Sequence, residues 1–201
     1  MARASFDKIA LLYNFVEKHI CEDYMNAHTL INEYLSLEPQ ETIIDVGGGT
    51  GLIAKVLRGK TQTSDIAVID LSRSMLKKIN DRTVSAIQGD ITVFPLKNET
   101  VSLAVLINTM HHIPREKQRV ALQEVNRILK KHGRIFIIDI WFPDTFLSNL
   151  FVKIEKLLVG KTAHLTADTM KQMVQDAGFQ EITVFLPKKY PYRYVVIGRK
   201  E

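Results

Sequence analysis

Residues 42–53 read Thr-Ile-Ile-Asp-Val-Gly-Gly-Gly-Thr-Gly-Leu-Ile, and they join three local patterns. The β-branched run at the start predicts a strand that is buried on both faces of a sheet. The glycines predict a turn, and residues 52–57 continue as a helix. Because glycine has no Cβ, such a turn can adopt positive φ and lets a ligand lie against the main chain. The helix that follows points its unpaired N–H groups into the same space.

The same alternation of strand and helix continues along the chain. It predicts a parallel sheet with right-handed crossovers and helices on both faces. Ser72 is placed as a helix N-cap, Pro114 opens a helix, and Gly133 follows a cationic run as a helix stop. The predicted strands are 42–46, 66–69, 84–88, 101–107 and 134–140, and the predicted helices are 52–57, 72–80, 115–130 and 166–178.

The end of the chain departs from this alternation. Two further strands are predicted at 180–186 and 192–198, with only residues 187–191 between them. This connector is too short for a crossover helix, so the two strands must be antiparallel.

Carboxylates stand where the first three predicted strands end. Asp45 lies just before the glycines, Asp70 ends the next apolar run, and Asp90 ends the one after it. A glycine-rich loop alone also occurs in dinucleotide enzymes. Here the glycines fall as G-x-G-x-G, and together with the two later acids the chain resembles the class I S-adenosylmethionine-dependent methyltransferases over about 42–139. The glycines are Gly47, Gly49 and Gly51.

This resemblance implies an α/β fold, with a Rossmann-like seven-stranded sheet, mostly parallel with an antiparallel C-terminal hairpin, and helices on both faces. It implies S-adenosyl-L-methionine as the cofactor, bound at the carboxyl ends of the strands. Asp70 is suited to accept both ribose hydroxyls, although it can also serve as a helix N-terminal acid. Asp90 can accept from the adenine amino group beside the Ile91 N–H, or be an ordinary loop aspartate.

The remaining cofactor contacts follow from the same resemblance. Asp45 is expected to hold the ammonium group, or alternatively to bond loop amides. The three glycines are close-approach positions, and Leu71 and Asn108 are further residues expected at the site.

The first part of the chain, 1–38, has helical periodicity. Residues 6–14 resemble the opening of the ubiquinone/menaquinone-biosynthesis C-methyltransferases, in which this segment forms a lid over the cofactor. The resemblance places Tyr13 near the methionine end, whereas an amphipathic helix packed on the sheet needs no ligand. Residues 1–201 are predicted to form a single domain.

Methyl transfer requires alignment of the acceptor and exclusion of water, and a base only if the acceptor loses a proton. The candidate bases are His111 and His112, after the fourth strand, because imidazole titrates near neutral pH. A capping or packing role is the alternative. No metal is expected, since Asp139 has no obvious companion and the other histidines lack ligand spacing.

Residues 141–178 are predicted to form a helical insertion that walls the acceptor site. Its aromatic side chains favour a small apolar or aromatic acceptor, although they can equally form ordinary core. The stretch 188–194 interleaves basic and aromatic residues, which leaves a cofactor-binding accessory or RNA-binding protein as an alternative. A nicotinamide-dependent oxidoreductase is a weaker one. The aromatic residues are Trp141, Phe142, Phe146 and Phe151.

The length and composition of the chain fit a globular protein. The chain has 201 residues, 46% hydrophobic and 24% charged, with a net charge of +5, which allows nucleic acid as a partner without requiring it. No apolar run approaches the roughly 18 residues that span a bilayer, and residues 1–8 lack the core of a secretory signal. A single cysteine, Cys21, fits a reducing cytoplasm, which is the expected location.

Overall fold

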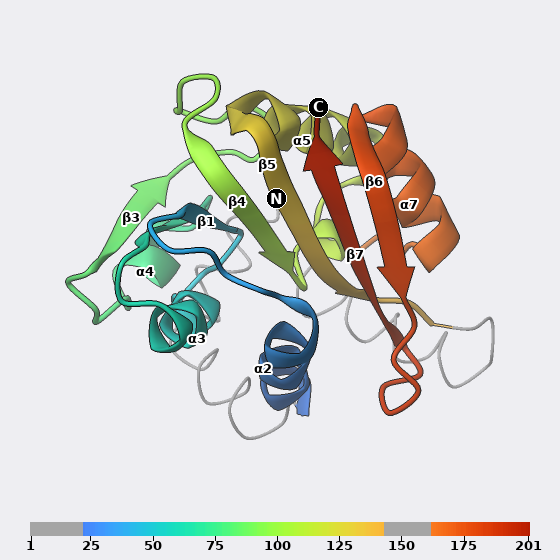
Figure 1. Ribbon diagram of the computed structural model, residues 1–201, viewed down its shortest axis with the longest axis horizontal. Coiled ribbons are helices and arrows are strands. Elements are labelled where there is room, and N and C mark those ends of the chain that lie inside the picture. The colour runs from blue at the N-terminus through green and yellow to red at the C-terminus, as the bar shows by residue number, and fades with distance from the viewer. Residues whose placement is uncertain (1–21, 143–161) are drawn as a thin grey trace.

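A seven-stranded sheet with the order β3-β2-β1-β4-β5-β7-β6 runs through the computed structural model, which describes residues 22–142 and 162–201 (Figure 1). Strands β1 to β5 are parallel to one another, and β7 lies antiparallel between β5 and β6. The predicted mostly parallel sheet with a C-terminal hairpin is therefore confirmed. The strands are β1 (Thr42–Val46), β2 (Asp65–Asp70), β3 (Val84–Gln88), β4 (Val101–Ile107), β5 (Leu129–Ile140), β6 (Phe179–Phe185) and β7 (Arg193–Lys200).

Helices cover both faces of the sheet, as predicted. Helices α2 and α3 lie on the face turned toward the viewer in Figure 1, and α5 and α7 lie behind it. The described helices are α2 (Glu22–Tyr34), α3 (Leu52–Lys60), α4 (Arg73–Leu76), the 3₁₀ turn η1 (Met110–His112), α5 (Arg115–Ile128) and α7 (Ala167–Asp176). None of these is long and apolar enough to cross a membrane.

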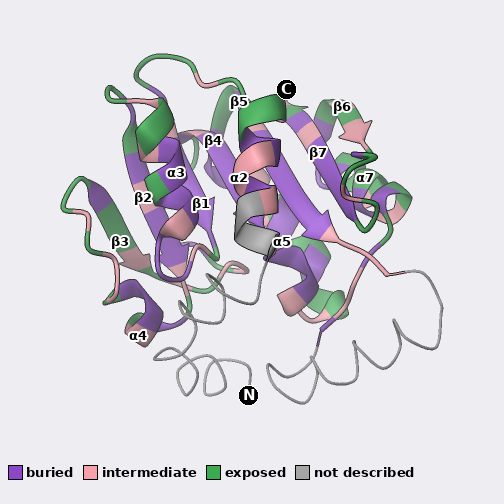
Figure 2. Ribbon diagram, turned by 90° about the horizontal axis from the view of Figure 1, so that it is seen from below, coloured by how far each residue is buried: buried purple, intermediate pink, exposed green. Residues whose placement is uncertain are grey.

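The strands divide their side chains between two hydrophobic layers. In β1, Ile43 packs with residues of α2 and α3, whereas its neighbours Ile44 and Val46 pack with residues of α5 and α7. This alternation follows from the two-residue period of a strand. The central strands are almost entirely buried and the edge strand β3 is mostly exposed, as Figure 2 shows.

Two of the local signals for helix ends, Ser72 and Gly178, mark the right places. The Ser72 hydroxyl accepts a hydrogen bond from the Met75 N–H at 3.3 Å, as an N-cap should. Gly178 follows α7 with a φ of 95°, a conformation that glycine tolerates best. The predicted extension of α4 to residue 80 was wrong, because the chain tightens after Leu76 into bonds of the i to i+3 type, such as that from the Ile79 N–H to the Leu76 carbonyl.

The predicted stop of α5 at Gly133 was also wrong. The helix ends at Ile128, and β5 begins at once with Leu129. Leu129 pairs with Val101 and Arg134 pairs with Leu103, so residues 130–133 bulge out of the strand. His132 takes the left-handed φ of 62° there. The cationic run therefore lies in a bulge between two strand pairings. Sequence periodicity does not reveal the pairing of Leu129 with Val101 that creates this bulge.

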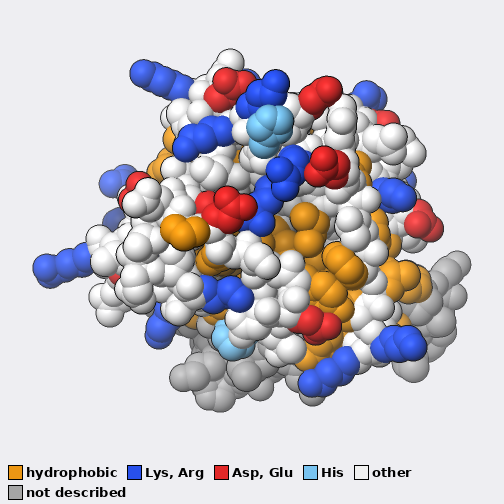
Figure 3. Space-filling model, in the orientation of Figure 1, with side chains coloured by type: hydrophobic (Ala, Val, Ile, Leu, Met, Phe, Trp, Pro, Cys, Tyr) orange, Lys and Arg blue, Asp and Glu red, His pale blue; other side chains and the backbone are white. Residues whose placement is uncertain are grey.

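One face of the sheet carries apolar surface. Figure 3 shows hydrophobic side chains gathered at the lower right of the face seen in Figure 1, where no described helix covers β7 and β6. Tyr34 of α2 contacts Phe185 of β6, with ring centroids 4.7 Å apart.

Candidate cofactor and active site

A cavity of about 370 Å³ lies at the carboxyl ends of the parallel strands, within the size range of small-molecule sites. From β1, the sheet continues with β2 and β3 on one side and with β4 and β5 on the other. The strand order therefore reverses between β1 and β4, and open α/β sheets bind ligands at such a point. The wall consists of residues 46–49, 69–72, 89–92, 107–109 and 112–114, together with Ala27, Leu52, Ile53, Met75, Phe94 and Lys117.

The glycine loop forms one side of the cavity. Gly47 and Gly49 line it with φ values of 71° and 54°. The Gly47 N–H donates to the Ile69 carbonyl at 2.7 Å, which ties the loop to β2. A Cβ at Gly47 would lie only 2.5 Å from Cγ2 of Thr109. Gly51 is not among the lining residues, and its space is limited by Ile79 instead.

Asp45 lies beneath the loop rather than in the cavity wall. Its side chain is buried, and a Cβ at Gly48 would overlap the carboxyl group, 2.8 Å from Oδ1. The structure thus places Asp45 against the underside of the glycine turn. A role for it in holding the ammonium group stays a prediction.

Asp70 joins the loop to the end of β2. Its Oδ2 accepts from the Gly49 N–H at 3.0 Å, and its Oδ1 accepts from the Ser72 N–H at 2.8 Å. These bonds fix the carboxylate at the cavity wall. These two bonds use two of the roughly four acceptor positions of a carboxylate.

Asp90 stands at the next strand end. Its Oδ1 accepts from the Thr92 N–H at 2.9 Å and from the Thr92 hydroxyl at 2.7 Å. The bond from the Thr92 amide is the main cause that holds the pKa of Asp90 below its usual value, so the group is a carboxylate at neutral pH. Ile91 lines the cavity beside it.

The loop after Asp90 is fastened to α5. Glu124 accepts from the Phe94 N–H at 2.9 Å, and Arg127 pairs with Glu124 at 2.8 Å. The same guanidinium donates to the Leu96 carbonyl at 2.9 Å. Phe94, which lines the cavity, is therefore held in place by a charged pair on a neighbouring helix.

Asn108 follows the last residue of β4 and has the left-handed conformation, with a φ of 53°. Its N–H donates to the Ile138 carbonyl at 2.9 Å, and its Oδ1 accepts from Arg193 Nη1 at 2.9 Å. Asn108 thus joins strands β4, β5 and β7 at the cavity. Both Asn108 and Leu71 line this cavity.

The two candidate bases have different positions. His112 lines the cavity, whereas His111 is buried behind it, with Nδ1 2.5 Å from Oδ1 of Asp139. Burial, followed by the charges of His111 and His164, holds the pKa of His112 well below its usual value. His112 is therefore a neutral imidazole near pH 7. Of the two, only His112 faces the space where a reaction can occur.

Sequence reasoning missed some lining residues. Thr109 donates its hydroxyl to the Val46 carbonyl at 2.9 Å and packs against Gly47; its place directly after a strand end was the available signal. Ala27, Met75 and Lys117 come from helices, and nothing in their local sequence marks them. Tyr13, the predicted lid residue, lies outside the described residues. In the described part of the chain, no group of three or more His, Cys, Asp or Glu side chains could hold a metal ion.

The residues present fit a nucleoside cofactor. The loop offers main chain without side chains at Gly47 and Gly49, and the carboxyl groups of Asp70 and Asp90 stand at neighbouring strand tips. Apolar side chains such as Met75 and Phe94 fill the wall between them. This donor set suits S-adenosylmethionine, which carries hydroxyls, an amino-purine and positive charge but no phosphate.

Comparison with known proteins agrees with this geometry. A family model described as a methyltransferase domain matches residues 43–133. The chain is 26% identical over 195 residues to a demethylmenaquinone methyltransferase of Chlamydia caviae, covering 88% of this chain and 83% of that protein. It is 24% identical over 174 residues to a ubiquinone/menaquinone biosynthesis C-methyltransferase of Escherichia fergusonii, covering 72% and 68%.

The fold has solved counterparts. A methyltransferase of Thermotoga maritima, described as a possible histamine N-methyltransferase, superposes over the whole of both chains with a TM-score of 0.81 and 20% identity. That likeness concerns the fold alone. The family-model match, the curated relatives and the fold together support a class I S-adenosylmethionine-dependent methyltransferase that resembles the ubiquinone/menaquinone C-methyltransferase group.

Proposed function

We propose that this methyltransferase acts on a small apolar or aromatic metabolite, of the kind represented by a hydroquinone ring. The observation that carries the proposal is a series of aromatic rings that runs from the hairpin loop to the cavity. Tyr192 lies 6.2 Å from Phe142, Phe142 lies edge-on to His164 at 5.0 Å, and His164 stacks on His111 at 4.9 Å. His111 in turn lies 3.9 Å from His112, which lines the cavity.

Such a series of rings beside the cavity favours a flat, weakly polar acceptor, because aromatic surfaces gain most from contact with another ring or apolar body. Tyr192 is 51% exposed, so the series begins at the surface. The curated relatives named above are a demethylmenaquinone methyltransferase and a C-methyltransferase of ubiquinone/menaquinone biosynthesis, and their names support the same class of acceptor. The predicted wall helix within 143–161 lies outside the described residues.

The residues of the cavity would hold the cofactor in a defined orientation. Asp70 would accept from the ribose hydroxyls and Asp90 from the adenine amino group, while Gly47 and Gly49 let the main chain approach. When bound, S-adenosylmethionine supplies a methyl group on a sulfonium centre that is already activated. The protein then contributes alignment and exclusion of water. His112 would accept a proton from acceptors that lose one on methylation.

The alternative of RNA binding has less support. In the interleaved stretch 188–194, Arg193 and Tyr194 are buried in the sheet and unavailable for contact with a nucleic acid. Lys189 lies 5.4 Å from the ring of Tyr190, an arrangement within the loop itself. A single-strand binding surface needs several exposed stacking rings beside its cations, and in this stretch Tyr192 is the one ring that is largely exposed.

The test is methyl transfer from labelled S-adenosylmethionine to a panel of acceptors analysed by mass. The panel contains hydroquinones and simple phenols, with histamine and a short RNA as polar comparisons. We expect label in the hydroquinone or phenol pool, and a His112→Gln variant should lose turnover while it still binds S-adenosylhomocysteine. Label only in histamine or RNA would contradict the proposed acceptor class.

A further inference from the structure

A cluster of imidazoles and one buried carboxylate lies directly behind the cavity. It consists of Asp139 at the end of β5, His111 and His112 in η1, and His164 just before α7. The two rings of η1 are 3.9 Å apart, and His164 lies nearly parallel to His111 at an angle of 17°. Asp139 and His111 are 1% and 4% exposed, so solvent screens their charges weakly.

Asp139 clamps the 3₁₀ turn from below. Its Oδ1 lies 2.5 Å from His111 Nδ1 and also accepts from the Ile140 N–H at 2.8 Å, and its Oδ2 accepts from the His111 N–H at 3.2 Å. Burial acts to raise the pKa of Asp139, but His111 and these amide donors lower it below its usual value. The group is therefore a buried carboxylate that the His111 imidazole contacts directly.

The upper side of the turn is held as well. The His111 carbonyl accepts from the Ala163 N–H at 2.7 Å. Gln118 of α5 donates to the Met110 carbonyl at 3.0 Å and to the Ala163 carbonyl at 3.1 Å. This fixes the segment that carries His164 against η1. The direction in which His112 projects is thus set by contacts with β5, α5 and the segment before α7.

The charges around His112 come from several elements. His111 contacts His112 directly, His164 stacks on His111, and Asp139 on β5 contacts His111. Lys117 of α5 lines the same cavity. Asp70 and Asp90 line it from β2 and from the loop after β3.

We propose that Asp139, His111 and His164 are positioning residues that hold His112 on the cavity wall as a neutral imidazole, so that this wall adds no positive charge beside the cationic cofactor. The inference rests on the proposed function only for the use of His112 as a base. A protonated His112 would disfavour the sulfonium of S-adenosylmethionine relative to the neutral thioether of S-adenosylhomocysteine, and it could accept no proton.

The test compares the dissociation constants of these two ligands by calorimetry between about pH 5.5 and 8, across the ordinary titration range of histidine. The ratio of the two dissociation constants cancels the contributions of the chemical groups that both ligands share. In the wild type the ratio should change by less than about 2-fold, because His112 stays neutral. In His111→Gln, the amide can still bond Asp139 but carries no charge. Because His112 then loses a cationic neighbour, it takes up a proton at higher pH than in the wild type. The ratio of dissociation constants should therefore shift against S-adenosylmethionine by about 3- to 10-fold at the acidic end of this pH range.

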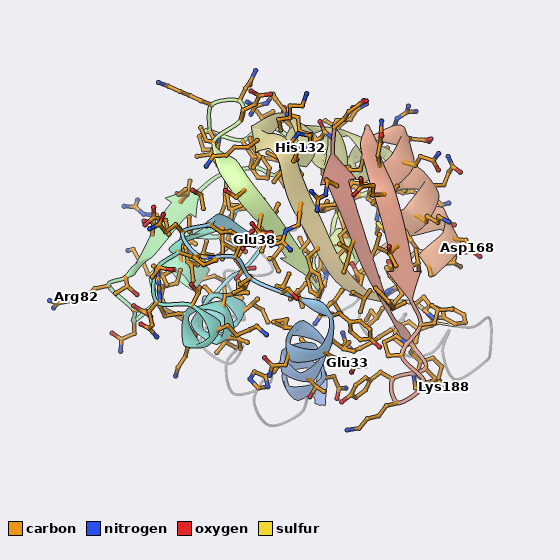
Figure 4. All side chains as sticks on the ribbon, in the orientation of Figure 1. Glu33, Glu38, Arg82, His132, Asp168 and Lys188 are labelled. Carbon is orange, nitrogen blue, oxygen red and sulfur yellow. The ribbon has the colours of Figure 1, made fainter. Side chains whose placement is uncertain are left out.

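A matched control is His132→Asn, in the exposed bulge of β5, where Asn suits the left-handed backbone (Figure 4). It should behave as the wild type does. If His111→Gln does not fold, His164→Gln removes the second imidazole whose charge lowers the pKa of His112, and it should produce a smaller shift in the same direction. A constant ratio in a folded variant that binds S-adenosylhomocysteine would overturn the proposal.

Proton NMR of the histidine rings in the ligand-free protein gives an independent readout. The resonance that disappears in His112→Gln should not titrate near pH 6.5 in the wild type, and it should do so in His111→Gln. Titration of that resonance at its ordinary pKa in the wild type would also overturn the proposal. A different outcome would refute only the proposed function. In that case the ligands bind and His112 titrates as expected here, but no apolar acceptor is methylated.

Discussion

Replacement of Gly48 by alanine tests how the glycine turn depends on the buried carboxylate beneath it. Gly48 does not have positive φ, so alanine fits the backbone and the only obstacle is space. The new methyl group would overlap the Asp45 carboxyl, which is 1% exposed and has little room to move. Overpacking of this kind costs about 1–3 kcal/mol. For a chain of 201 residues this corresponds to a fall in Tm of about 3–10 °C.

The matched control is Gly59→Ala in α3, where a Cβ would meet nothing within 4 Å. There alanine should stabilise the helix by up to about 0.5–1 kcal/mol. Thermal unfolding measures both variants, and calorimetry with S-adenosylhomocysteine measures the turn itself. Gly48→Ala should weaken that binding on the order of 10-fold, since Gly47 and Gly49 line the cavity on either side. Equal stability and equal affinity in the two variants would refute this reasoning.

Three further predictions concern the cavity wall. Asp70→Asn should weaken binding of S-adenosylhomocysteine by about 10-fold or more, because an amide donor replaces one charged acceptor; unchanged calorimetry would contradict the ribose role. Thr109→Val keeps the shape of the side chain but loses the bond to the Val46 carbonyl, so urea unfolding should show a loss of about 1–2 kcal/mol. Because the folded pKa of Asp90 is lowered, its stabilising bonds to Thr92 are present above the unfolded value of about 3.9 and are lost as pH falls through the folded value. The difference in unfolding free energy between wild type and Asp90→Asn should therefore shrink below about pH 4, and a constant difference would count against this account.

The sequence predicted most of the sheet because its strands carry strong local signals. The bounds of β1, β3 and β4 agree with the predicted ranges, since each is a β-branched or apolar run between polar turns. The start of β5 failed for a physical reason. Residues 130–133 look like the charged end of a helix, but pairing of Leu129 with Val101 draws the chain into the sheet earlier.

The site shows the same division. Asp70, Asp90 and Asn108 follow strand ends, so their place at the cavity could be predicted from order alone. Whether a residue faces the cavity or lies behind it depends on packing across the sheet. His111 and His112 are adjacent in sequence, yet one contacts Asp139 and the other lines the cavity. Spacing along the chain does not distinguish between the two positions.

The position of β7 has a consequence for synthesis of the protein. β7 follows β6 in the chain but lies between β6 and β5 in the sheet. A nascent chain that has not yet reached Arg193 therefore has no partner for β6, and the backbone edge of β5 is open on that side. Such an edge is a site for unwanted pairing between chains. A chain truncated before Arg193 should therefore aggregate, because it carries both the unpaired β6 and the open edge of β5.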